Sequence, residues 1–92
     1  MANFISMVYS VYAIKNKNGR IYVGLTKNIN QRLEDHNKGR VFSTKGYKPW
    51  NLLYSESCKN RIEARKREKS LKSGYGKEFL KNLSRGSSVV EQ

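Results

Sequence analysis

Two tyrosines with a strong turn signal between them are the first residues in this chain whose types and spacing suggest chemistry. Tyr12 and Tyr22 lie on either side of Asn18-Gly19, a dipeptide that favours a β-hairpin. A two-residue turn pairs strand residues whose numbers sum to 37, and the two phenols then point to opposite faces of the hairpin. The three-residue loop Lys17–Gly19 pairs residues whose numbers sum to 36, and both phenols then lie on one face. Both loops are common, and tyrosine is also simply a good strand residue. A joint role for the phenols therefore requires the odd-length loop or a bulge.

The segment that follows the hairpin carries two more candidates, Arg32 and His36. Ile29, Leu33 and His36 recur at helical spacing, so they define an inward face, and Arg32 lies at its border. A guanidinium in that position can bind a phosphate through two parallel hydrogen bonds, although a solvated surface arginine is the commoner case. For an inward His36, a packed or hydrogen-bonded role is favoured over catalysis.

Glu68 is the acidic residue that its surroundings explain least. The segment 59–72 carries seven basic residues and only two acidic ones, Glu63 and Glu68. Glu63 stands at the capping-box position after Asn60. Glu68 follows Ala64 by four positions and precedes Leu71 by three, so it shares their inward face. A carboxylate that points at a sheet either pairs with a cation or binds a metal, and position alone gives these alternatives equal weight.

Three short apolar runs and three helical patterns should position these side chains. Strands are predicted at residues 8–14, 21–25 and 50–55, where β-branched and aromatic residues are common. Helices are predicted after the N-caps Asn28 and Asn60, the first ending near Gly39 and the second at about Ser73, before Gly74. A short last helix is expected at 77–83, and the basic stretch 40–49 should be an exposed loop.

The resulting order, ββαβαα, predicts an α/β (α+β) fold: a small three-stranded antiparallel sheet flanked by helices. We expect one domain at residues 8–84, an N-terminal extension at 1–7 and a flexible tail at 85–92. With 92 residues, the chain is large enough for one domain but not for two.

The charge of the chain points to a polyanionic partner. Nineteen Lys and Arg residues stand against seven Asp and Glu residues, a formal net charge of +12. We expect DNA as the partner, with RNA still open, because neutralising phosphates releases counterions. Candidate phosphate contacts are the basic residues of the loops and helix surfaces: Lys27, Lys38, Arg40, Lys45, Lys48, Arg61, Arg65, Lys69 and Lys72. Tyr47 and Trp50 could stack on a base, with packing favoured for Trp50.

The single cysteine, Cys58, excludes an intramolecular disulfide and a zinc site made of cysteines. A lone thiol suits a reducing compartment, so we expect the cytoplasm. No apolar run approaches a membrane span, and neither a membrane partner nor a signal peptide is expected. We expect a monomer.

In their order along the chain, these residues resemble the GIY-YIG nuclease superfamily. Ser10-Val11-Tyr12 stands for the first motif and Tyr22-Val23-Gly24 for the second. Arg32-Leu33, His36-Asn37 and the segment 63–68 are similar to the helix motifs of its small stand-alone members. These members are themselves similar to the N-terminal nuclease domain of the larger excision-repair endonuclease. No single triplet is specific, but the ordered set, which runs from about Val8 to Leu83, is.

The resemblance implies a Mg²⁺-dependent (or Mn²⁺-dependent) endonuclease that hydrolyses DNA, with structure-directed or low sequence specificity, in DNA repair or recombination. Tyr22 would act on the attacking water beside Tyr12, Arg32 would stabilise phosphate charge, and Glu68 would hold the metal. His36 would position groups or transfer a proton, and Gly24 would allow close backbone approach. The alternative is a non-catalytic nucleic-acid-binding module on the same fold. The chain departs from the family pattern in two places. Ser10 replaces the family glycine. The family also has a polar residue near the site, late in its sequence, for which only Lys72 or Asn82 is a candidate here.

Overall fold

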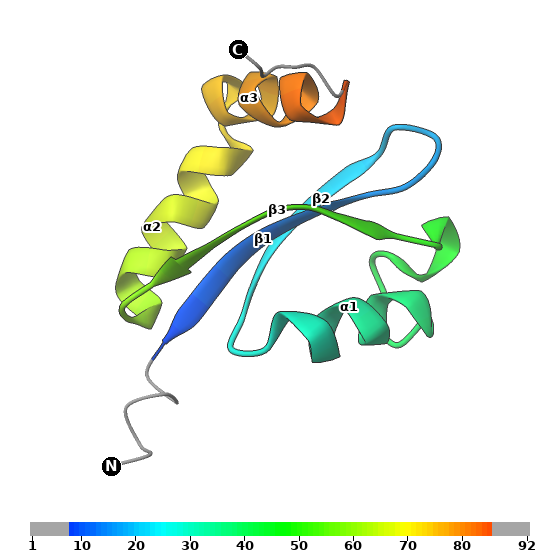
Figure 1. The fold of residues 1–92 in the computed structure, drawn as a ribbon, viewed down its shortest axis with the longest axis horizontal. Coiled ribbons are helices and arrows are strands. Elements are labelled where there is room, and N and C mark those ends of the chain that lie inside the picture. The colour runs from blue at the N-terminus through cyan, green and yellow to red at the C-terminus, as the bar shows by residue number, and fades with distance from the viewer. Residues whose placement is uncertain (1–7, 86–92) are drawn as a thin grey trace.

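The sheet has three antiparallel strands, and β1 (Tyr9–Lys15) lies between β2 (Ile21–Thr26) and β3 (Asn51–Cys58) (Figure 1). The computed structural model describes residues 8–85; the expected N-terminal extension and all but the first residue of the expected tail lie outside this range. Because β1 is central, its side chains alternate between two covered faces. The strand is accordingly buried from Val11 to Ile14.

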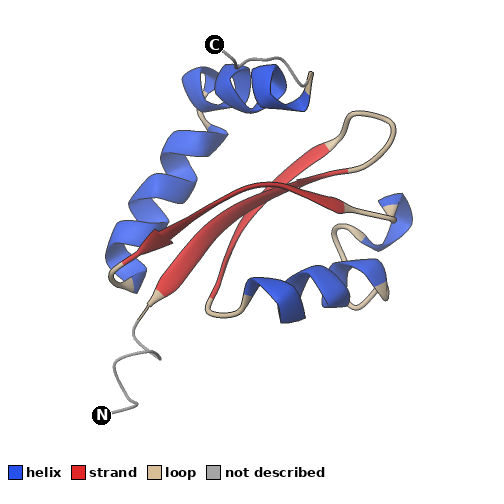
Figure 2. Ribbon diagram, in the orientation of Figure 1, coloured by secondary structure: helices blue, strands red, loops and turns tan. Residues whose placement is uncertain are grey.

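Helices cover both faces of the sheet. α1 (Ile29–Asn37) lies on one side, and α2 (Arg61–Lys72) and α3 (Gly74–Ser84) lie on the other (Figure 2). A single 3-10 turn, η2 (Lys45–Tyr47), interrupts the loop between α1 and β3. The predicted order ββαβαα and the three-stranded antiparallel sheet are confirmed.

The β1–β2 hairpin has the odd-length loop. Ile14 pairs with Tyr22 and Tyr12 pairs with Gly24, which is the register in which residue numbers sum to 36. Gly19 adopts φ +91°, a conformation that closes three-residue loops and that other residues rarely adopt. Tyr12 and Tyr22 therefore project from the same face of the sheet, the face covered by α1.

The N-caps of the first two helices were predicted correctly, whereas the start of the third helix was not. The side chains of Asn28 and Asn60 accept hydrogen bonds from the backbone N–H groups of Gln31 and Glu63, as expected. The prediction that Gly74 terminates α2 was wrong, because Gly74 is the first residue of α3. Ser73 instead ends α2 and caps α3, because its hydroxyl donates to Ser70 O (2.6 Å) and accepts from Gly76 N (3.3 Å).

As a consequence, α3 begins at Gly74, about one turn before the expected start. The third strand also runs to Cys58, beyond the expected Ser55. Gly76 lies where the two helices meet, and a Cβ atom there would collide with the backbone of Ser70 and Leu71. The α2–α3 corner therefore needs glycine at this position, a requirement that the sequence did not signal.

Candidate active site

Three aromatic side chains meet on the α1 side of the sheet. The Tyr12 hydroxyl lies 2.7 Å from His36 Nε2. The Tyr22 ring packs edge-on against His36 with centroids 5.1 Å apart, and 6.4 Å separates the two tyrosine centroids. The fold thus brings together Tyr12 from β1, Tyr22 from β2 and His36 from α1, as a joint role of the tyrosines requires.

Gly24 makes room for one of these side chains. A Cβ atom at Gly24 would lie 2.7 Å from the Tyr12 hydroxyl oxygen, closer than such atoms can approach. The absent side chain therefore lets the Tyr12 phenol lie directly over the backbone of β2. The close approach expected at Gly24 is made by the protein's own tyrosine.

A buried threonine contacts the other ring nitrogen of His36. Thr44 Oγ1 lies 2.7 Å from His36 Nδ1 and 3.4 Å from the carbonyl oxygen of Val41. If the hydroxyl donates to that carbonyl, it accepts from Nδ1–H, and Nε2 is left to accept the Tyr12 hydroxyl proton. The prediction that residues 40–49 form an exposed loop is wrong at Thr44, because only 1% of the surface of this residue is exposed.

Burial sets the protonation of both partners. Burial lowers the pKa of His36, and the positive charge of Arg32 lowers it further. Burial also raises the pKa of the Tyr12 phenol to about 12, although the Arg32 guanidinium opposes this rise. At neutral pH the pair is therefore a neutral imidazole hydrogen-bonded to a neutral phenol.

Arg32 presents a donor that the protein does not use. Its Nε is buried and has no hydrogen-bond partner among the described residues. A hydrogen-bonding contact with the Tyr12 phenol is the largest cause of the raised pKa of Arg32, and the Tyr22 phenol raises this pKa further. Because buried donors are nearly always paired, this N–H is suited to an anionic ligand.

Glu68 lies on the inward face of α2 and is only 9% exposed. Lys72 Nζ is 3.1 Å from Oε2, and Arg65 NH1 is 3.5 Å from Oε1. The cations are about half exposed, whereas the carboxylate is not. The negative charge of Glu68 also contributes to the raised pKa of Tyr12, which places this α2 residue near the tyrosine cluster.

The remaining predicted residues lie around this centre with different surroundings. Trp50 is packed, with Nε1 donating to Thr44 O at 3.1 Å, whereas Tyr47 is 41% exposed beneath the Arg20 guanidinium. Of the two late polar candidates, Lys72 lies beside Glu68, whereas Asn82 lines a separate hollow with Arg67 and Tyr75. Lys72 is therefore the candidate that lies beside Glu68.

The predicted phosphate contacts are all exposed, and two of them form ion pairs that do not involve Glu68. Lys38 pairs with Glu34 at 2.7 Å, and Arg40 pairs with Asp35 at 3.0 Å. Both pairs lie at the end of α1, beside the loop that carries Lys45 and Lys48. Arg61, Arg65 and Lys69 line one shallow hollow on α2, and Lys27 follows β2.

Metal-binding side chains are sparse. Between residues 8 and 85, no three His, Cys, Asp or Glu side chains are grouped to hold an ion. A metal here would therefore depend on the Glu68 carboxylate together with water and substrate oxygens, a donor set that Mg²⁺ accepts.

The same described part of the chain contains no helix suited to span a bilayer.

Comparison with known proteins identifies the family of the chain. The model of the GIY-YIG catalytic domain matches residues 8–82. The UPF0213 protein of Desulfotalea psychrophila is 40% identical over 65 residues, which span 67% of this chain and 58% of that protein. The UPF0213 protein of Staphylococcus aureus strain Mu3 is 39% identical over 64 residues, 68% of this chain and 78% of that one.

A solved structure shares the fold. The solution NMR structure of the UPF0213 protein BH0048 from Bacillus halodurans is 30% identical, with a TM-score of 0.52 over 87% of this chain and 88% of that one. The matched segment contains all five residues of the site: Tyr12, Tyr22, Arg32, His36 and Glu68. The chain belongs to the family of the GIY-YIG catalytic domain.

Proposed function

We propose that this protein is an endonuclease that uses Mg²⁺ or Mn²⁺ to hydrolyse DNA phosphodiester bonds at the site around Tyr12, Tyr22 and Arg32. Family membership supports nuclease chemistry. The observation that carries the proposal is the buried Arg32 Nε, which has no partner within the described residues. A phosphate oxygen supplies the charge and the acceptor that this donor lacks.

The two phenols have different roles. Tyr12 is buried and bonded to His36, so it acts as a fixed neutral donor that orders the site. Tyr22 is half-buried, and its hydroxyl makes no hydrogen bond within residues 8–85. Tyr22 is therefore the phenol free to bind and orient the attacking water. Arg32 then stabilises the negative charge that develops on the phosphate.

Glu68 is the residue that would hold the metal ion. Its carboxylate is nearly buried, and the two cations that face it are long, half-exposed side chains that can move aside. A divalent ion bound there supplies Lewis-acid polarisation of a phosphoryl oxygen and lowers the pKa of bound water. Lys72 would then be released to contact the phosphate backbone.

The substrate preference proposed here is low in sequence specificity. The exposed candidates around the site are lysines and arginines, which contact phosphates and fix position without reading base edges. The structure of the DNA, rather than its sequence, would then determine where the protein cuts. Such a preference suits a role in DNA repair or recombination. RNA remains a second polyanion to test.

A second candidate function is nucleic-acid binding without cleavage. It is favoured by the two ion pairs of Glu68, because a carboxylate neutralised by its own protein needs no metal. The two candidates differ in what Glu68 does, so one experiment separates them.

The test is nicking of supercoiled plasmid by wild type, Glu68→Gln and Glu63→Gln, with Mg²⁺, Mn²⁺ or EDTA. Both substitutions remove one negative charge from α2, but Glu63 lies at the exposed start of the helix, so Glu63→Gln is the matched control. We expect wild type and Glu63→Gln to nick with either metal, and Glu68→Gln to be slower by about 10²–10³-fold. DNA binding, measured by fluorescence anisotropy, should be retained in all three.

Two results would contradict the proposal in different ways. Binding by wild type without any nicking would leave the binding module. Nicking that survives Glu68→Gln at full rate would refute Glu68 as the metal ligand.

A further inference from the structure

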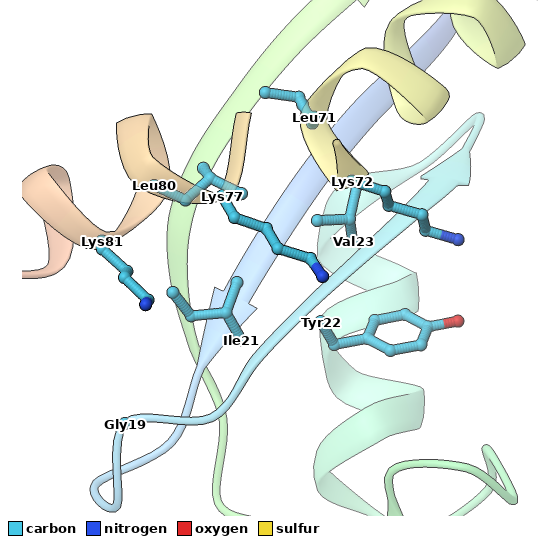
Figure 3. A pocket seen from close by; sticks show the side chains of 9 residues that line it. All are labelled: Gly19, Ile21, Tyr22, Val23, Leu71, Lys72, Lys77, Leu80 and Lys81. Atoms are coloured by element: carbon cyan, nitrogen blue, oxygen red, sulfur yellow. The ribbon is translucent and has the colours of Figure 1, made fainter. Parts of the chain in front are cut away.

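A pocket of about 350 Å³ opens along the outer edge of β2, between that strand and the end of α2 and start of α3 (Figure 3). Its floor is apolar and comes from both layers: Ile21 and Val23 from the strand, Leu71 from α2 and Leu80 from α3. Leu71, Leu80 and Val23 are buried, so they form a rigid backing, and the half-buried Ile21 presents the accessible apolar surface. Tyr22 stands at the end of the pocket, and its phenol reaches toward the candidate active site.

Three lysines form the rim of this pocket: Lys72, Lys77 and Lys81. Lys77 and Lys81 lie four positions apart on α3, and neither forms an ion pair with another described residue. Like charges at this spacing repel and weaken a helix, so helix stability does not explain the pair. Their charge is available to an anion outside the protein.

The lysine rim leads from the pocket to the candidate active site. Lys72 Nζ lies 3.1 Å from Glu68 Oε2, and the amino groups of Lys72 and Lys77 point to the side on which the Tyr22 hydroxyl lies (Figure 3). The three lysines therefore extend from the pocket toward the side of the candidate active site, and a phosphodiester chain can follow them.

We propose that the pocket holds a single unpaired nucleotide next to the scissile phosphate, with its base on the apolar floor and its phosphate between Lys77 and Lys81. This inference rests on the proposed nuclease function and names the substrate feature recognised. The volume lies at the small end of ligand pockets and suits one nucleotide but no base pair. A base can enter only where it has left the duplex, so the protein selects DNA with an unpaired position beside the cut.

The first test is binding in the absence of metal, so that it does not depend on cleavage. The ¹⁵N-labelled full chain is titrated with thymidine 5′-monophosphate, thymidine or inorganic phosphate and followed by NMR. We expect the monophosphate to shift amides of β2 and of α3 near Lys77, and to bind about tenfold more tightly than phosphate or thymidine, because base and phosphate both contribute. Equal binding of phosphate alone, or shifts confined to other surfaces, would overturn the proposal.

A charge-matched pair of variants locates the binding. Lys77→Gln/Lys81→Gln should weaken binding of the monophosphate about tenfold, since two phosphate contacts are lost. Lys59→Gln/Lys66→Gln removes the same charge from a different hollow, beside Arg67, and should leave binding unchanged. If both double variants weaken binding of the monophosphate equally, net charge alone explains the effect, and the proposal that the pocket binds a nucleotide is refuted.

A cleavage experiment then tests the preference. Wild type should cut a duplex with one unpaired nucleotide about tenfold faster than the fully paired duplex, and Lys77→Gln/Lys81→Gln should lower this ratio about fivefold or more. Cutting of both substrates at equal rates by wild type would refute the pocket while leaving the nuclease proposal intact. Absence of cutting together with monophosphate binding would refute the nuclease and leave the pocket as a binding site.

Discussion

The two faces of the sheet are built from different chemistry. On the side of α2 and α3, apolar side chains such as Val11, Ala13 and Leu71 pack together, and the nearly buried Glu68 lies on the inward face of α2. On the side of α1, Tyr12 and Ile14 pack with Trp50, and a chain of buried polar groups runs through the cluster. The same central strand supplies both faces, since alternate residues of β1 point in opposite directions.

The difference assigns separate tasks to the two sides. Burial of apolar surface on the α2–α3 side stabilises the fold. The α1 side holds the hydrogen-bonded Tyr12, His36 and Thr44 and the unpartnered Arg32 Nε, an arrangement that contributes less to stability but suits an anionic substrate. The open edge of β2 is where the two sides meet, because Glu68 of α2 lies near the tyrosines there.

The largest expected effect is loss of stability on the apolar side. Leu71→Ala should lower the free energy of unfolding by about 2–5 kcal/mol, because it leaves a cavity in a packed core. Chemical denaturation followed by circular dichroism measures the change. Leu52→Ala is the matched control, since Leu52 is 45% exposed and its truncation should have little effect. If both variants lose the same stability, the α2–α3 side is not the main core.

The next largest effect belongs to the polar side and concerns activity. Arg32→Gln should slow DNA cleavage by about 10²–10³-fold, because a charge that stabilises the transition state is lost. The free energy of unfolding should be unchanged or slightly higher, since the variant removes a buried donor without a partner. Arg85→Gln, which removes an exposed charge at the end of α3, is the control for net charge. A large loss of stability in Arg32→Gln would show that this arginine is structural.

A smaller effect is expected from the buried hydrogen-bond chain. Tyr12→Phe leaves His36 Nε2 without its partner and should lower the free energy of unfolding by about 1–3 kcal/mol. Tyr9→Phe also removes a phenol hydroxyl from β1, but Tyr9 forms no side-chain hydrogen bond to another described residue, so it should be nearly neutral. Equal stability of the two variants would mean that the Tyr12–His36 bond contributes nothing.

The hairpin shows how far the sequence could predict this site and where it stopped. Asn18-Gly19 located the turn, but it is compatible with loops of two or three residues. The longer loop is selected by Asn16, whose side-chain oxygen accepts from the backbone N–H groups of Asn18 (3.0 Å) and Arg20 (2.9 Å). The amide of Asn16 also donates to Tyr47 O at 2.9 Å, a contact between distant segments that no local pattern reveals.

The same limit applies elsewhere in the site. Helical spacing correctly placed Ala64, Glu68 and Leu71 on one inward face, because periodicity records burial directly. Thr44 could not be found in this way, since it lies in a basic loop without periodicity and its role depends on contact with His36. Ser73 was missed because Gly74 carries the stronger stop signal, whereas the serine hydroxyl provides the cap. Family resemblance, rather than pattern, supplied the roles of Tyr22 and Arg32, and these stay predictions.

The smallest effect expected is a pH dependence that separates the two sides without any change in the apolar core. The pKa of His36 in the folded protein is lowered from its ordinary value of 6.5, chiefly by burial. Below pH 6.5 the unfolded chain therefore binds a proton that the folded protein does not, and stability falls as the pH falls. For one proton, the slope is at most about 1.4 kcal/mol per pH unit.

This window is distinct from that of the carboxylates with lowered pKa values. Glu34, Asp35 and Glu56 have ordinary values of 4.5, 3.8 and 4.5, so their contributions are lost only as the pH falls below those values. Denaturation of wild type and His36→Gln between about pH 5 and 6.5 isolates the histidine. We expect wild type to lose stability across this range and His36→Gln to be less stable but flat. A slope that persists in His36→Gln would place the titrating group outside the polar side and break the division of tasks between the two faces.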